Sequence, residues 1–302
     1  MNKLLIYIPS YNRYDYLIRQ LNLLCSEIQE DLISNVNIVV SDNASSDYRY
    51  HHLQDIYPSP LVRIKRNRLN IGSVGNVTRG FEEDNWDYIW ILGDDDEVKP
   101  GACKIISNEI AYGDCSIYYL KCKIKGNERV YDGEIITNQH DYFSKFSALA
   151  MMGFISANVF SRAIVQYIEY MYLYGYTLFP FLAAVFKLSE HKNFSLKCIG
   201  GDLVAWTPNN RSYDHIYDMA ITNFLTLTEL LSDCNAKKTL IDMFTQDFGV
   251  SHYFHITLRK KRHFIKAISQ IGFGRTVSIS FRYLIIRVRS NVSCFIKRII
   301  CN

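Results

Sequence analysis

Four consecutive carboxylates follow a strongly apolar segment in the first half of the chain. Residues 89–92 form a predicted buried strand, and Asp94, Asp95, Asp96 and Glu97 come directly after Gly93. Neighbouring like charges repel, so such a cluster is tolerated where a cation or solvent neutralises it. At the C-terminal end of a parallel strand, where α/β sheets bind ligands, the pattern indicates a divalent-metal site for a phosphorylated ligand. A solvated acidic loop before a helix is the alternative from this segment alone.

Two other predicted strand ends also carry polar side chains. Asp42 follows the apolar run 36–40, where its carboxylate could accept hydrogen bonds from a nucleobase N–H or a ribose hydroxyl. Tyr11 and Arg13 follow the run 4–8 and offer a ring for stacking on a base and a cation for phosphate. Each signal is weak alone, and together they favour nucleotide binding at one edge of a sheet.

The surrounding sequence predicts the elements that would position these residues. Short apolar runs alternate with stretches of helical spacing: strands are expected at 4–9, 36–40, 61–65 and 88–92, and helices at 14–29, 74–83 and 100–112. This alternation implies crossover connections and a mostly parallel sheet that is covered on both faces. We therefore expect an α/β fold.

Composition excludes several other classes of protein. The chain has 302 residues, of which 48% are apolar, with 22 Tyr and 17 Phe, so a disordered chain is excluded. The eight Cys form no C-x-x-C pair, which argues against a zinc ribbon or a small disulfide scaffold. Scattered thiols in a reducing compartment are the expectation.

The charge is unevenly distributed. The chain carries 34 basic and 30 acidic residues, a net charge of +4. Eleven of the basic residues and none of the acidic ones lie beyond Asp247, so the first 247 residues carry 23 basic against 30 acidic side chains. An acidic body is thus followed by a basic tail, for which we expect a separate task.

The basic tail, residues 259–302, includes an amphipathic segment. On a helical wheel five apolar residues fall within an arc of about 80°, namely Leu284, Val288, Val292, Phe295 and Ile299. Three hypotheses stay open: the apolar stripe docks on the protein's own core, it lies on an anionic membrane surface, or the tail binds nucleic acid.

The conjunction of motifs resembles a known family. The order of residues 8–13 (IPSYNR), 40–47 (VSDNASSD), 70–72 (NIG) and 92–96 (LGDDD) is similar to that of the family-two glycosyltransferases of GT-A fold. More narrowly, it resembles the bacterial members that build O-antigen or capsular polysaccharide. The resemblance covers residues 3–125 and implies a Rossmann-like, mostly parallel sheet flanked by helices, followed by a helical, basic C-terminal extension.

The resemblance implies three regions and a nucleotide-sugar donor. Residues 1–125 would be the nucleotide-sugar-binding half, residues 126–215 the acceptor-side half, and residues 216–302 the helical region that carries the basic tail. Within the first half the donor would contact Pro9, Tyr11, Arg13, Asp42, Asn70 and Gly72. Pro9 and Tyr11 would line the nucleoside pocket, and Asp42 would contact the base.

The acidic cluster would be the D-x-D element of the family. Asp94 would contact the donor, Asp95 and Asp96 would bind Mg²⁺ or Mn²⁺, and Asp95 would take part in catalysis. Cleaving a sugar–diphosphate bond leaves negative charge on the leaving group, which a cation held by carboxylates stabilises. The division of labour among the three aspartates stays open.

The second half offers candidates for the remaining roles. Residues 152–162 are similar to the family segment that lines the acceptor side, and Arg211 lies in a late loop that would cover the donor phosphates. Many relatives carry a general base, a carboxylate, at the start of an acceptor-side helix. The corresponding positions near 174–177 hold no carboxylate, so Glu190 is the candidate base, with a surface charge as the alternative.

The resemblance implies a metal-assisted enzyme that transfers a sugar from a nucleotide-diphosphate donor to a lipid-linked oligosaccharide. The expected location is cytoplasmic, with residues 259–302 as a peripheral anchor on the inner face of the membrane and no nucleic-acid partner. Two alternatives remain. A sugar nucleotidyltransferase would need a glycine-rich loop that residues 9–13 lack. A non-catalytic α/β binding protein, attached to membrane or nucleic acid by its basic tail, would need no base.

Overall fold

The computed structural model describes residues 1–57, 60–122, 130–146, 149–207 and 224–247. The chain divides into two compact units, Met1–Arg211 and Ser212–Asn302. The basic tail 259–302 lies outside the described residues.

The first unit contains an eight-stranded mixed sheet with the order β3-β2-β1-β4-β8-β6-β9-β7. Its strands are β1 (Leu4–Ser10), β2 (Val36–Asp42), β3 (Val62–Arg66), β4 (Tyr88–Ile91), β6 (Ile117–Leu120), β7 (Ile135–Ile136), β8 (Asn158–Ser161) and β9 (Leu196–Ile199). The pairs β1–β2, β2–β3, β1–β4 and β6–β9 are parallel. The pairs β4–β8, β6–β8 and β7–β9 are antiparallel.

The N-terminal strands agree with the sequence prediction. Strand β1 is a continuous apolar run and is almost wholly buried, as expected of a parallel strand that is covered on both faces. The antiparallel insertion of β8 between β4 and β6 was not expected, because residues 126–215 show no clear period in the sequence. The sheet therefore combines a regular parallel half with a mixed half.

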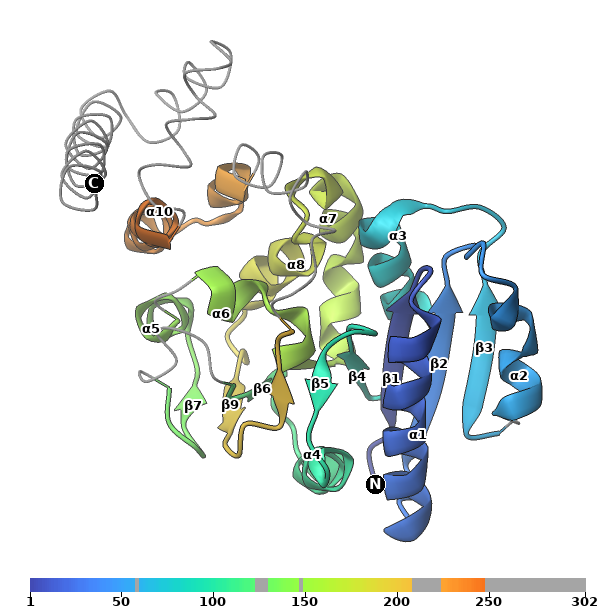
Figure 1. Cartoon of the computed structure of the whole chain (residues 1–302). Coiled ribbons are helices and arrows are strands. Elements are labelled where there is room, and N and C mark those ends of the chain that lie inside the picture. Colours follow the sequence, from blue (N-terminus) through green and yellow to red (C-terminus); the bar gives the residue numbers. More distant parts are fainter. Residues whose placement is uncertain (58–59, 123–129, 147–148, 208–223, 248–302) are drawn as a thin grey trace, which may run out of the picture. The chain divides into compact units, whose positions relative to one another are not determined.

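Helices cover the sheet (Figure 1). They are α1 (Tyr14–Glu30), α2 (Leu53–Ile56), α3 (Gly72–Thr78), α4 (Ala102–Ala111), α5 (Gln139–Lys145), α6 (Leu149–Gly153), α7 (Ile168–Leu173) and α8 (Pro180–Leu188). Helices α1 and α4 contact each other, whereas α3, α7 and α8 form a second group of mutual contacts. On α1 the buried apolar stripe includes Leu17, Leu21, Leu24 and Ile28, which matches the helical spacing in the sequence.

A small second sheet lies beside the acidic cluster. Strand β5 (Glu97–Val98) pairs antiparallel with β10 (Val204–Ala205), so residues far apart in sequence lie together. Because β5 begins at the fourth carboxylate, this pairing brings the segment that ends at Thr207 to the acidic loop.

The described part of the second unit is helical, with η8 (Phe224–Leu230) and α10 (Cys234–Asp247). Its buried side chains include Leu227, Leu231 and Leu240. Among the residues that the structure describes, no helix combines the length and the apolar character needed to cross a membrane.

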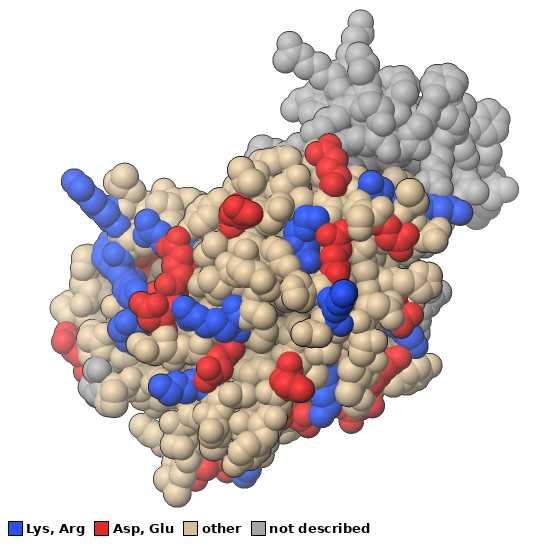
Figure 2. All heavy atoms as spheres, turned by 180° about the vertical axis from the view of Figure 1, so that it is seen from behind, with Lys and Arg blue, Asp and Glu red and all other residues tan. Residues whose placement is uncertain are grey.

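Charges are mixed on the surface of the described residues. On the face shown in Figure 2, Lys and Arg side chains alternate with Asp and Glu side chains. Among the described residues, this face therefore presents no large area of one sign.

Candidate active site

Two aspartates after β4 are nearly buried and share one cation. Asp94 is 4% exposed and Asp95 is 9% exposed. Arg13 Nη1 lies 3.0 Å from Asp94 Oδ1 and 3.1 Å from Asp95 Oδ1. Ser10 Oγ, at the end of β1, donates to Asp94 Oδ2 at 2.6 Å. The parallel neighbours β1 and β4 thus place their C-terminal ends together and orient the carboxylates.

The third aspartate is held from the other half of the sheet. Ser156 Oγ donates to Asp96 Oδ2 at 2.5 Å and accepts from the Gly93 N–H at 2.9 Å. The indole N–H of Trp90 donates to the Ser156 carbonyl at 2.7 Å, and the Thr207 N–H also donates to Asp96. Asp96 is therefore held by Ser156 and Thr207, which lie 60 or more residues further along the chain.

Gly93 leaves room for the Asp96 carboxylate. A Cβ at position 93 would lie 2.5 Å from Asp96 Oδ2, closer than real Cβ atoms come, and 3.2 Å from Asp96 Cγ, so the Asp96 side chain would have to shift. The absence of a side chain therefore lets the Asp96 carboxylate fold back against the loop.

Gln20 supports the same loop from α1. Its Nε2 donates to the Gly93 carbonyl at 2.9 Å and to the Asp96 carbonyl at 3.2 Å. Gln20 is 4% exposed, and among the described residues its Oε1 has no hydrogen-bond partner. The sequence contains a signal for this role, because Gln20 stands on the buried face of α1 beside Leu17 and Leu21.

Asp42 is buried at the end of β2 with both oxygens engaged. Arg66 Nη1 donates to Asp42 Oδ2, and the Ser45 N–H donates to Asp42 Oδ1 at 2.9 Å. Arg66 Nη2 also donates to the Ser45 carbonyl at 2.7 Å. Since Asp42 is only 1% exposed, its orientation is fixed before any ligand binds.

Asn70 and Gly72 form the turn that enters α3. The Asn70 Oδ1 atom accepts from Asn43 Nδ2 and from the Gly72 N–H, both at 2.9 Å. Gly72 has a φ of +79°, a backbone conformation that favours glycine. This turn therefore lies next to Asn43, the neighbour of Asp42.

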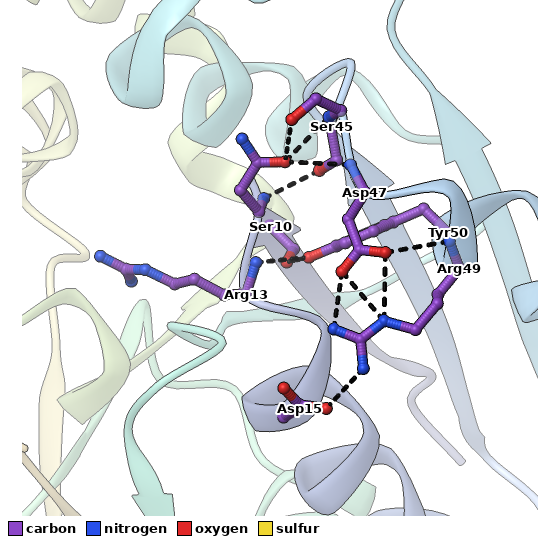
Figure 3. Close-up of polar contacts among 9 residues, drawn as sticks. Ser10, Arg13, Asp15, Ser45, Asp47, Arg49 and Tyr50 are labelled. Carbon is purple, nitrogen blue, oxygen red and sulfur yellow. Dashed lines mark hydrogen bonds and ion pairs between the residues drawn. The ribbon is translucent and has the colours of Figure 1, made fainter.

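Hydrogen bonds tie the end of β1 to the loop after β2 (Figure 3). The Tyr50 hydroxyl lies 2.6 Å from Ser10 Oγ and accepts from the Arg13 N–H at 3.0 Å. Asn12 Oδ1 accepts from the Ser46 N–H at 2.8 Å. Tyr11, between these anchored residues, leaves 43% of its surface exposed, so its ring is available for stacking. Pro9 is half-buried in β1, in register with Ser41 of β2.

The contacts described above do not include the candidate base Glu190. Glu190 lies beyond the C-terminal end of α8, where Glu190 Oε2 is 2.8 Å from Lys187 Nζ. The opposite end of α8 begins at Pro180, preceded by Phe179, whose ring lies against Gly153. Arg211 lies outside the described residues.

Burial dominates the electrostatics of the acidic loop. Burial raises the pKa of Asp94 to about 6, although the Arg13 charge and the Ser10 hydrogen bond oppose the rise. Burial likewise raises the pKa of Asp96 to about 7, with the Ser156 hydrogen bond opposing and the neighbouring carboxylates adding to the shift. The loop therefore holds protons at a pH where free aspartates have lost them.

Stability of the free protein should therefore depend on pH through this loop. With folded-state pKa values of about 6 and 7, Asp94 and Asp96 stabilise the fold at low pH, and this contribution is lost as the pH rises towards 7. We expect the melting temperature to rise when the pH is lowered from 7.5 to 5.5. Thermal melts of wild type and of a variant with Asp94→Asn and Asp96→Asn measure this. Equal pH dependence in the two proteins would contradict it.

The carboxylates of the acidic loop fit a divalent cation whose remaining coordination positions are filled by a phosphorylated ligand and water. Among the described residues, no three His, Cys, Asp or Glu side chains form a metal cluster. Mg²⁺ commonly binds through only one or two carboxylates, with phosphates and water as its other ligands. Asp94 and Asp95, both within 3.1 Å of one cationic nitrogen, provide such a pair.

Sequence reasoning missed several residues that shape the site. These are Ser10, Gln20, Tyr50, Arg66 and Ser156. Ser10 and Ser156 stand within segments that the motif comparison quoted, so their positions carried a signal. Tyr50 and Arg66 carried none, because only the fold brings them to Ser10 and Asp42.

Solved structures define the class of fold. A fragment of S. aureus TarS, residues 1–349, in complex with UDP-GlcNAc matches with a TM-score of 0.62 at 12% identity, over 92% of this chain and 83% of that chain. The mannosyltransferase PcManGT from Pyrobaculum calidifontis, in complex with GDP-Man and Mn²⁺, matches with a TM-score of 0.52 at 9% identity, over 95% and 81% of the two chains. The fold is that of the GT-A glycosyltransferases.

The family follows from the sequence. The family model "Glycosyl transferase family 2" matches residues 5–163, which is more than half of the chain. The protein belongs to glycosyl transferase family 2, and the family and fold predicted from the motifs are confirmed. The abequosyltransferase RfbV of Salmonella typhimurium is 33% identical over 102 residues, which amounts to 33% of this chain and 30% of RfbV.

Proposed function

We propose that the protein transfers one sugar from a nucleotide-diphosphate donor to a lipid-linked glycan in the synthesis of a surface polysaccharide such as O-antigen or capsule. The observation that carries the proposal is the meeting of Asp42, Arg13 and the Asp94–Asp95 pair at the ends of adjacent parallel strands. Structural neighbours hold UDP-GlcNAc or GDP-Man, and the partial relative RfbV is an abequosyltransferase, which supports this choice.

In the proposed donor complex, separate side chains contact the base, the metal and the phosphates. The exposed ring of Tyr11 would stack on the base, and the rigid Asp42 would select it through its remaining lone pairs. Asp94 and Asp95, rather than the pair Asp95 and Asp96 expected from the sequence, would hold Mg²⁺ or Mn²⁺, and the cation would stabilise the charge on the departing diphosphate. Arg211, in the late loop, would add a cation to the phosphates.

The acceptor side is proposed to lie towards the start of α8. Phe179 packs against Gly153, which stands three residues before Ser156, the partner of Asp96. Glu190 enters the proposal as general base by its sequence distance from the acidic motif alone. The lipid-linked nature of the acceptor rests on the likeness to O-antigen enzymes.

A thermal-shift panel tests donor binding. We expect one of UDP, GDP, CDP and dTDP to raise the melting temperature, more strongly with Mn²⁺ than without. At a concentration of 100 Kd, binding adds about 2.7 kcal/mol of stability, which corresponds to a rise of about 5 to 10 °C for a unit of this size. In Asp95→Asn the metal-dependent part should vanish. Flat curves with all four nucleotides would instead support a non-catalytic binding protein.

The tail is proposed to attach the enzyme to the cytoplasmic face of an anionic membrane. Each Lys or Arg near such a surface contributes about 1 kcal/mol, and residues 259–302 carry eleven of them. Deletion of residues 259–302 should abolish co-sedimentation with vesicles that contain phosphatidylglycerol, whereas neutral vesicles should retain neither protein. Undiminished binding of the truncated protein would refute the attachment.

A further inference from the structure

A single guanidinium group bridges the two carboxylates at the centre of the site. Its nitrogen Arg13 Nη1 is within 3.1 Å of an oxygen of Asp94 and of Asp95. The side chains of the two aspartates are 4% and 12% exposed, whereas that of Arg13 is 23% exposed. The arginine is thus the most solvent-accessible member of the group.

The backbone of Arg13 is anchored independently of its side chain. Its N–H donates to the Tyr50 hydroxyl, and the residue immediately precedes α1. The side chain extends away from the neighbouring Asp47–Arg49 ion pair (Figure 3). The guanidinium group can therefore change partners by side-chain rotation, without movement of the loop.

The position of this guanidinium group has a consequence for metal binding. Arginine stays charged at all physiological pH values, so it cannot be neutralised in place. Asp94 Oδ2 already accepts from Ser10, so a divalent cation that bridges the two carboxylates would bind the Oδ1 atoms that Arg13 Nη1 now contacts. Two cations on the same oxygen atoms repel each other strongly, so such a cation would displace the guanidinium group. A diphosphate offers the displaced guanidinium group an alternative anion of suitable geometry.

We propose that Arg13 is a resident counter-cation, which neutralises Asp94 and Asp95 in the free enzyme and moves to the donor diphosphate when the metal binds. This inference rests on the proposed function. Metal binding and nucleotide binding then depend on each other. The metal alone, or the nucleotide alone, must compete with the ion pair between Arg13 and the two aspartates. When both bind, the aspartates pair with the metal and Arg13 pairs with the diphosphate. Linkage requires each ligand to raise the affinity of the other by the same factor.

Manganese titrations of the full chain, followed by the electron paramagnetic resonance of free Mn²⁺, test this without any turnover. Wild type should bind Mn²⁺ weakly alone and at least about tenfold more tightly with a saturating nucleoside diphosphate from the panel above. Arg13→Gln should bind Mn²⁺ alone at least about tenfold more tightly than wild type, and should gain less from the nucleotide. Arg13→Lys, which keeps the charge, should stay near wild type.

Arg49→Gln is the matched control for overall charge. Arg49 lies on the neighbouring loop and pairs with Asp47 and Asp15, so its loss should leave Mn²⁺ affinity unchanged. Equal or weaker binding of Mn²⁺ alone by Arg13→Gln would overturn the inference. If that variant does not fold, a wild-type affinity for Mn²⁺ that nucleotide changes by less than twofold would overturn it. This test is separate from the test of the proposed function, because Mn²⁺ binding by wild type and by Arg13→Gln can be compared without any nucleotide.

Discussion

Replacement of Asp95 by asparagine is expected to lower the rate of sugar transfer by about 10²- to 10³-fold, since the loss of one preorganised electrostatic contact to developing charge has an effect of this order. The Asp95 side chain is 12% exposed, with Oδ1 3.1 Å from Arg13 Nη1. Asparagine keeps the volume and removes the charge that the proposed cation needs. The measurement is kcat for donor consumption at saturating metal.

The control for this substitution is Asp55→Asn on α2. The Asp55 side chain is 80% exposed and its ion pair is with His52. We expect a rate within twofold of wild type and an unchanged melting temperature. A rate for Asp95→Asn as high as that of the control would show that the Asp95 carboxylate is not needed for transfer.

Replacement of Trp90 by alanine is expected to lower the free energy of unfolding of the first unit by about 3–5 kcal/mol. Trp90 is 0% exposed in β4, between β1 and β8, and its indole N–H donates to the Ser156 carbonyl. The change would leave both a cavity and an unpaired carbonyl. Chemical denaturation followed by far-ultraviolet circular dichroism measures the loss.

Trp90→Phe separates the two contributions. Phenylalanine retains much of the ring volume but removes the hydrogen bond to Ser156, so a smaller loss is expected. Because Ser156 holds the acidic loop through the Gly93 N–H and Asp96, this variant should also weaken metal-dependent nucleotide binding. A loss of less than about 1 kcal/mol for Trp90→Ala would contradict the buried role of the side chain.

The parallel half of the sheet was predictable because its signals are local. Apolar runs of four to seven residues end in polar motifs, and β1, β2 and β4 begin and end within two residues of the predicted limits. The positions of Asp42 at the end of β2 and of Asp94 just after β4 follow directly from these strand limits. Strand β8 was not predictable, because pairing with β4 and β6 depends on contacts distant in sequence.

The contacts between side chains in the site were less predictable than the identity of the residues that form it. The sequence predicts Arg13 as a phosphate-binding cation, and in the structure its guanidinium group contacts Asp94 and Asp95, which the sequence did not indicate. Likewise Asp96 depends on Ser156, whose pairing requires the fold to bring together β4 and the turn before β8. Side-chain partnerships of this kind arise from tertiary geometry, about which local sequence patterns carry little information.

We expect the protein to consume a nucleotide sugar and to extend a lipid-linked glycan. The most direct measurement supplies the purified full chain with Mn²⁺, a panel of nucleotide sugars and lipid-linked oligosaccharides, and follows nucleoside diphosphate release together with acceptor mass. We expect release with one donor class, an acceptor heavier by one sugar residue, and loss of both signals in Asp95→Asn. No donor consumption by folded, metal-loaded wild type with any acceptor would contradict it.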